Sequence, residues 1–266
     1  MKKLSETRTD KKILIIGAGG TGKTHIIGTL CEVMPTLVVT ADENGLETLK
    51  TQGVEPAGVI ILSNWQDCWA DYKEIVGMQG KAQAIALDHL GATQEIIQDK
   101  IILTPRKWEE NTFNRNRAAA EATYKREIML GERRLAQDQW GSMWLGLDAF
   151  LNAILSLNFA VKLVTVLESV AENPRDGQEH VYPNLQKAMR LSISAKFGLV
   201  ANSFIGSQGE DTYFALTCRS HPRIETKSRY GPGRTWENPT ALSLLGYMNR
   251  KGGEESEIEK KLGVGL

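Results

Sequence analysis

The sequence has little cysteine, no long apolar run and no net charge, and each absence excludes a class of protein. Its three cysteines, Cys31, Cys68 and Cys218, lie too far apart in 266 residues to predict a disulfide framework or a metal cluster. No stretch approaches the roughly 18 uncharged apolar residues of a membrane span. The basic N-terminus leads into no apolar signal-peptide core. We therefore expect a protein of the reducing cytoplasm that does not enter a membrane.

The balance of charge excludes a uniformly basic protein that coats DNA. The chain has 32 Lys and Arg residues against 32 Asp and Glu residues. Their distribution is uneven, however, because residues 105–134 carry eight basic and five acidic side chains. Residues 219–251 carry seven basic and two acidic side chains. Local surfaces that bind phosphate remain compatible with a neutral total.

Apolar runs and helical patterns alternate along the chain. This order predicts an α/β fold with a mostly parallel sheet flanked by helices and a C-terminal antiparallel hairpin. The expected strands are 13–16, 37–40, 59–62, 84–87 and 161–167, and the expected hairpin pairs 199–205 with 212–218. The expected helices are 23–33, 43–51, 67–76, 143–157 and one long exposed helix over 111–135.

The same pattern suggests one domain between two tails. We expect a mobile basic tail over 1–11, a single domain over 12–250 and an acidic flexible tail over 251–266. A helical insertion over about 105–146 interrupts the domain.

A phosphate-binding loop is the strongest signal in the sequence. The pattern G-x-x-x-x-G-K-[ST] is satisfied in full between an apolar strand and a helix. Its residues are Gly17, Ala18, Gly19, Gly20, Thr21, Gly22, Lys23 and Thr24. Glycines let backbone N–H groups turn inward around a phosphate, and the helix N-terminus adds partial positive charge. Lys23 is then placed for the β- and γ-phosphates of ATP, and the Thr24 hydroxyl for Mg²⁺.

Two carboxylates follow neighbouring strands and extend this site. Asp88 ends the run over 84–87, where a second Mg²⁺ contact belongs, although it could simply cap the next helix. Glu43 follows the strand over 37–40 and could polarise a water for attack on the γ-phosphate. Asp42 is the substitute for that role, and capping is the alternative for both. The guanine-reading pattern Asn-Lys-x-Asp is absent, which disfavours a GTPase.

These residues resemble the core of RecA-type ATPases, and the resemblance implies that the domain over 12–250 is a RecA-like P-loop ATPase. Ala41-Asp42-Glu43-Asn44-Gly45-Leu46 is similar to the Asp-Ala-Glu-x-x-Leu stretch that supplies the catalytic glutamate there. Asp88 matches the Walker B aspartate, although His89 follows it where RecA has Ser. The strand over 161–167 looks like the one that carries the γ-phosphate sensor. The resemblance places that role on Glu168, where RecA has Gln.

A Lys-x-Arg pattern near the C-terminus extends the resemblance. Lys227, Arg229 and Gly231 resemble the Lys-x-Arg-x-Gly signature of hexameric replicative helicases and related RecA-like proteins. In that family the Lys and Arg reach across a subunit boundary to the γ-phosphate of the neighbour. The resemblance therefore implies a homo-oligomer, a ring or a filament, whose active sites are shared. The alternative is a solvated basic turn.

The chain looks most like the compact, AAA-type RecA-like ATPases encoded by bacteriophages. The segment over 135–141 resembles the polar, aromatic and glycine stretch that those proteins carry after Walker B. This resemblance covers roughly 12–235 and implies single-stranded DNA annealing or recombination in the cytoplasm of a bacterial host. The implied partners are other copies of the chain, single-stranded DNA and a single-strand-binding protein.

The helical insertion offers candidate DNA contacts. Basic residues alternate there with aromatic ones such as Phe113 and Tyr124, which suits stacking on unpaired bases. The candidates are Arg115, Arg117, Lys125 and Arg126. A solvated helix of mixed charge is the alternative, because five Glu share the segment.

Two other functions remain open at this point. One is a DNA motor or helicase loader, and the other is a P-loop phosphotransferase for a small molecule, with 111–135 as its lid. A Lys-x-Arg pattern that acts across subunits favours the DNA-dependent ATPases over the phosphotransferase.

Overall fold

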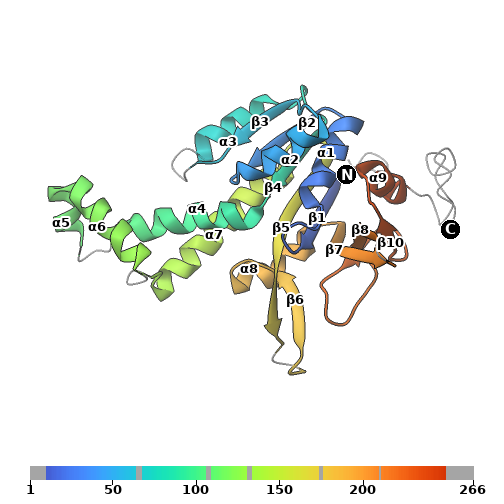
Figure 1. The fold of residues 1–266 in the computed structure, drawn as a ribbon. Helices are drawn as coiled ribbons and strands as arrows, with labels where there is room; N and C mark the ends of the chain where they lie inside the picture. The colour runs from blue at the N-terminus through green and yellow to red at the C-terminus, as the bar shows by residue number, and fades with distance from the viewer. Residues whose placement is uncertain are drawn as a thin grey trace, which may run out of the picture.

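The computed structural model describes residues 10–63, 68–105, 109–130, 134–173, 176–209 and 211–249. In these ranges a mixed β-sheet runs through the molecule, with helices on both faces (Figure 1). Of the predicted tails, only Asp10 and Lys11 lie within the described residues, so the mobility of the tails stays a prediction. None of the described helices is long and apolar enough to cross a membrane.

The sheet has the strand order β10-β8-β7-β1-β5-β4-β2-β3, with β6 paired to β5 and β9 to β7. The strands from β7 to β3 are parallel: β1 Lys11–Gly17, β2 Thr36–Thr40, β3 Gly58–Ile61, β4 Ala84–Asp88, β5 Val161–Glu172 and β7 Leu199–Gln208. The other strands are antiparallel to their partners: β6 Glu179–Pro183, β8 Asp211–Thr217, β9 Lys227–Ser228 and β10 Thr235–Glu237. The carboxyl ends of β1, β2, β4 and β5 therefore meet at one edge, where ligands of such sheets bind.

Helices cover the sheet in two layers. One face packs on α1 Lys23–Val33, α2 Asn44–Gln52 and α9 Ala241–Met248. The other packs on α3 Cys68–Gly77, α4 Leu90–Leu103, α7 Gln137–Ser156, α8 Lys187–Ser192 and the 3₁₀ turn Ile193–Lys196. Alternate residues of β1 enter the two cores, Ile13 and Ile15 on one side and Leu14 and Ile16 on the other. Burial on both faces explains why the strand is a continuous apolar run.

The predicted fold class is confirmed. The sheet is mostly parallel, and β7 and β8 form the expected C-terminal antiparallel hairpin. Helix α1 begins at Lys23 as predicted. Helix α2 is followed by its C-cap, Gly53, which adopts the left-handed backbone with φ of 69°.

The helical insertion differs from the prediction. The long helix expected over 111–135 is wrong, because the chain forms α5 Glu110–Arg115 and α6 Arg117–Met129. They divide at Asn116, whose side chain accepts a hydrogen bond from Ala119 N at 3.1 Å and caps α6. The helices α4 and α7 extend away from the sheet and carry α5 and α6 at their far end (Figure 1). We call α5, α6 and the distal part of α4 the helical arm.

Candidate nucleotide-binding and catalytic site

The turn between β1 and α1 has the shape of a phosphate-binding loop. Gly22 stands before α1 with φ of 83°, and a Cβ built on it would lie 2.8 Å from Cγ of Phe214. Both features require glycine. Thr21 Oγ1 lies 2.7 Å from Ser203 Oγ on β7, and that hydroxyl contact fixes the loop to the neighbouring strand.

Lys23 is buried inside this loop, with 7% of its surface exposed. Its Nζ donates to the carbonyl oxygens of Gly17 at 2.9 Å and Ala18 at 2.6 Å. Burial lowers the pKa of Lys23, while the carboxylates of Asp88 and Glu168 act in the opposite direction. The ammonium group is therefore held at the loop by the backbone, where it can exchange carbonyl oxygens for phosphate oxygens.

Asp88 and Thr24 meet at the same edge of the sheet. Thr24 Oγ1 donates to Asp88 Oδ2 at 2.9 Å, and Thr165 Oγ1 donates to Asp88 Oδ1 at 2.6 Å. Asp88 is 6% exposed and is thus fixed from both sides. A hydroxyl and a carboxylate oxygen fit Mg²⁺, which is often held by one or two carboxylates together with substrate phosphates. The described residues contain no group of three or more His, Cys, Asp or Glu side chains that could hold a metal ion.

The capping alternative for Asp88 is not what the structure has. His89, with φ of 66°, is the N-cap of α4, and its Nδ1 accepts a hydrogen bond from Ala92 N at 2.8 Å. His89 N also donates to Thr165 Oγ1 at 2.9 Å. Capping of α4 therefore falls to His89, and both oxygens of Asp88 face the loop and β5.

Glu43 lies in the turn that follows β2, two residues before Gly45. A Cβ on Gly45 would be 2.9 Å from Asp88 Oδ2, so this turn packs directly on that carboxylate. Asp42 Oδ1 accepts hydrogen bonds from N and Nδ2 of Asn44, both at 3.0 Å. The Glu43 side chain is exposed and makes no capping hydrogen bond. Asp42 thus stabilises the start of α2 and leaves the carboxylate of Glu43 available.

Glu168 lies beside the loop, because its neighbour Leu167 pairs with Gly17. Its Oε2 accepts a hydrogen bond from Asn202 Nδ2 at 3.2 Å, and Asn202 is buried on β7. An ionised carboxylate only accepts hydrogen bonds, so Glu168 cannot donate to a phosphate oxygen as an amide could. The side-chain amide of Asn202, which contacts Glu168, is able to donate a hydrogen bond.

A cavity of about 530 Å³ opens beside the loop. Its walls include His25 and Phe214, whose rings are 5.6 Å apart, together with Glu47 and Thr51 of α2. Gln52 also lines it, with Nε2 2.5 Å from His25 Nδ1. Aromatic and polar walls next to a phosphate loop suit a nucleoside.

Lys227 and Arg229 are not brought to the phosphate loop of their own chain. β9 pairs with Leu199 and Val200 at the start of β7, roughly 10 Å along the strand from Ser203. Lys227 Nζ donates to Ser194 O at 3.0 Å, and the exposed Arg229 donates from Nη2 to Ala195 O at 3.4 Å.

The four predicted DNA contacts also lie away from the loop, on the helical arm. Arg115, Arg117, Lys125 and Arg126 are exposed, whereas residues 106–108 and 131–133 fall outside the described chain. Helix α4 starts just after Asp88 and has 14 residues, so it separates the arm from the site by roughly 21 Å. A lid over the loop, as a phosphotransferase would need, is therefore not favoured.

Sequence reasoning missed the residues that fix the site from behind: Thr165, Asn202, Ser203 and Phe214. Thr165 carries a readable signal, because it is a polar residue inside the buried run of β5. Asn202 and Ser203 likewise interrupt an apolar run, but nothing local indicates which loop they contact.

Comparison with known proteins gives a match to one family and a distant structural neighbour. A family model described as AAA domain matches residues 9–230. A search of curated protein sequences gives no match. Among solved structures, the flagellar accessory protein FlaH from Methanocaldococcus jannaschii is similar, with 12% identity, 87% of each chain covered and a TM-score of 0.38.

Proposed function

The chain belongs to the AAA domain family, and from that premise we propose that it is a Mg²⁺-dependent ATPase that acts on single-stranded DNA. The observation that carries the proposal is the convergence of Lys23, Thr24 and Asp88 at one edge of the sheet. An ammonium, a hydroxyl and a carboxylate beside a helix N-terminus are the groups that nucleotide phosphates with a divalent cation require. The pathway that we propose is recombination or strand annealing of the bacteriophage type.

In this proposal the loop holds the phosphates and the neighbouring strands hold the reacting groups. Lys23 leaves the Gly17 and Ala18 carbonyls and binds β- and γ-phosphate oxygens. Thr24 and Asp88 are the residues that would hold Mg²⁺, which when bound would offset the charge of the phosphates. The nucleoside occupies the cavity between His25 and Phe214.

Glu43 is the proposed general base. Its exposed carboxylate belongs to the turn that packs on Asp88 through Gly45, where we propose that it orients a water toward the γ-phosphate and accepts the proton of that water. Glu168 and Asn202 share the γ-phosphate sensor in this account. Asn202 donates to the phosphate, and Glu168 holds that amide and balances the charge of Lys23.

Lys227 and Arg229 are proposed to complete the site of a neighbouring copy in a ring or filament. Their distance from the loop of their own chain and the exposure of Arg229 support this role. A planar guanidinium stabilises the charge that builds on the phosphoryl oxygens in the transition state. An isolated monomer is then a poor ATPase.

The test is ATP hydrolysis measured over a range of protein concentrations, with and without an oligo-dT strand. The proposal predicts that activity per chain rises as copies assemble and rises again with the strand. Activity per chain that is constant with concentration would contradict the shared site. A rate that ignores single-stranded DNA would contradict the assigned substrate.

A further inference from the structure

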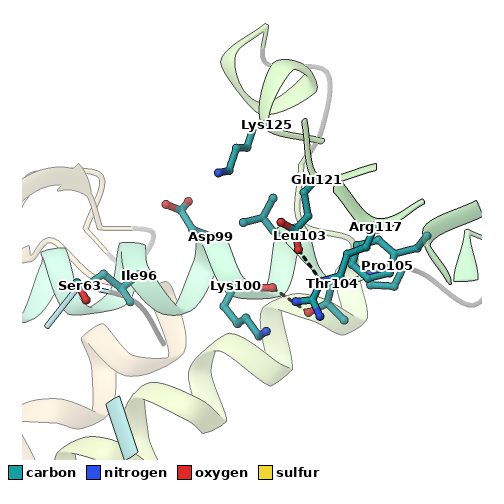
Figure 2. Close-up of a pocket in the computed structure, with 11 residues that line it drawn as sticks. Ser63, Ile96, Asp99, Lys100, Leu103, Thr104, Pro105, Arg117, Glu121 and Lys125 are labelled. Atoms are coloured by element: carbon teal, nitrogen blue, oxygen red, sulfur yellow. Dashed lines mark hydrogen bonds and ion pairs between the residues drawn. The ribbon is translucent and has the colours of Figure 1, made fainter. Parts of the chain in front are cut away.

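A second cavity, of about 640 Å³, runs along α4 from Ser63 and Ile96 to the helical arm. It lies between the distal part of α4 and α6, as Figure 2 shows. Helix α4 contributes Asp99 and Lys100, and helix α6 contributes Arg117, Glu121 and Lys125. The α6 residues recur every four positions and so share one helix face.

The charges of this cavity converge on Glu121. Arg117 Nε donates to Glu121 Oε1 at 2.9 Å, and this hydrogen bond lowers the pKa of Glu121. The positive charges of Arg117, Lys125 and Lys100 act in the same direction. Glu121 therefore lies among three cationic side chains that line the same cavity.

The bond between Arg117 and Glu121 is easily exchanged. Their side chains are 64% and 36% exposed, and water screens ion pairs of that kind. A phosphate oxygen carries the same charge as the carboxylate and accepts the same hydrogen bonds. A polyanion that replaces Glu121 also releases its own counterions, which favours the exchange.

The walls favour a single strand over a duplex. Phe113 lines the cavity, stacks on Tyr124 with ring centroids 6.1 Å apart, and lies 5.7 Å from the guanidinium of Arg117. Arg117 covers this ring in the free protein, so a base that stacks there must be unpaired and must take the place of the guanidinium. Asp99 also lines the cavity, and its negative charge repels a phosphate there. Partial burial raises the pKa of Asp99 and so weakens this repulsion.

We propose that this cavity binds the phosphodiester backbone of single-stranded DNA and that Glu121 occupies the phosphate position until the strand displaces it. Lys100, Arg117 and Lys125 are then the phosphate contacts. The inference rests on the proposed function, which supplies single-stranded DNA as the substrate. It adds the place of binding and a built-in competitor that keeps the free arm from capturing other anions.

The experiment compares the wild-type chain with Glu121→Gln, Glu110→Gln and the double variant Lys100→Gln/Lys125→Gln. Binding of a labelled oligo-dT strand is followed by fluorescence anisotropy over a salt series, and circular dichroism checks folding. Glu110, on α5, is the matched control, because it lies on the arm outside the cavity. Glu121→Gln is expected to bind about threefold to tenfold tighter, and Glu110→Gln within about twofold of wild type. The double variant is expected to bind more weakly, with the log–log salt slope reduced by about 0.7 for each lost contact.

Each outcome decides the inference. Equal tightening by both Glu variants would reduce the effect to net charge and overturn it. A folded double variant with wild-type affinity and slope would overturn it and leave the proposed function standing. A wild-type chain that binds no oligo-dT would defeat both. Polyglutamate that competes as well as oligo-dT at equal charge would make the cavity a general anion site, which also contradicts the inference.

Discussion

Lys23 in the phosphate loop and Arg117 on the helical arm are two cations that differ in burial and in their partners. Lys23 is 7% exposed and is held by two backbone carbonyls at fixed distances. The Arg117 side chain is 64% exposed and pairs with Glu121 one helical turn away. A buried ammonium needs defined partners, so its surroundings are rigid and its role is narrow. An exposed guanidinium can exchange partners, and that freedom suits a surface that captures and releases a strand.

Replacement of Lys23 should have the largest effect, because this cation has no substitute in the loop. Lys23→Ala is expected to lower ATP hydrolysis by about 10³-fold or more, since it removes a preorganised charge at the phosphates. Thermal unfolding should show a stable chain, because the variant no longer buries a charge. Phosphate release measures the first effect. A Lys23→Ala variant that keeps a tenth of the wild-type activity would contradict the view that Lys23 is less replaceable than the exposed Arg117.

Replacement of Arg229 should have the second largest effect on ATP hydrolysis. Arg229→Ala is expected to lower the hydrolysis rate by about 10²- to 10³-fold with nucleotide binding retained, because the charge acts in the transition state. Arg219→Ala is the matched control, since Arg219 is also exposed in the segment that follows β8. Equal losses in the two variants would show that the basic charge of this surface matters, and not a specific contact of Arg229 with the site of a neighbouring copy.

Glu43→Gln should separate chemistry from structure in the turn after β2. We expect about a 10²-fold lower rate with ATP affinity unchanged, because the amide cannot accept the proton of the water. Asp42→Ala should instead cost about 1 kcal/mol of stability by removing the hydrogen bond that Asp42 accepts from Asn44 N at the start of α2, with little effect on the rate per folded chain. The two effects are read by steady-state kinetics and by thermal unfolding. Reversed effects would exchange the two roles.

The smallest expected effect distinguishes two neighbours on the arm. Lys125 lines the arm cavity, whereas Arg126 is exposed outside it. Lys125→Gln should reduce the salt slope of oligo-dT binding by about 0.7, and Arg126→Gln should change the affinity less than about twofold. Identical salt slopes in the two variants would indicate a diffuse basic surface in place of a built cavity.

The nucleotide site could be predicted because its residues follow strands that the sheet arranges. Once Gly22 and Lys23 place the start of α1, parallel pairing brings Asp88 to the same edge without any side-chain information. The turn after β2 follows the same rule. What could not be predicted is the support from other strands, such as Thr165 and Asn202, since their partners are distant in sequence.

The arm could not be predicted to the same depth, for physical reasons visible in its residues. Helix α4 packs its apolar side chains on both the sheet and α7, so it lacks a single apolar face that periodicity would detect. The break at Asn116 has no Gly or Pro and depends on one capping side chain. Lys100 and Glu121 line one cavity from two different helices, and no local pattern specifies that arrangement.

Mixing the two inactive variants tests the shared active site most directly. A Lys23→Ala chain supplies an intact Arg229, and an Arg229→Ala chain supplies an intact phosphate loop. Random assembly of equal amounts should restore ATP hydrolysis at about a quarter of the interfaces, well above either variant alone. A mixture that hydrolyses ATP no faster than the average of its two components would contradict the account.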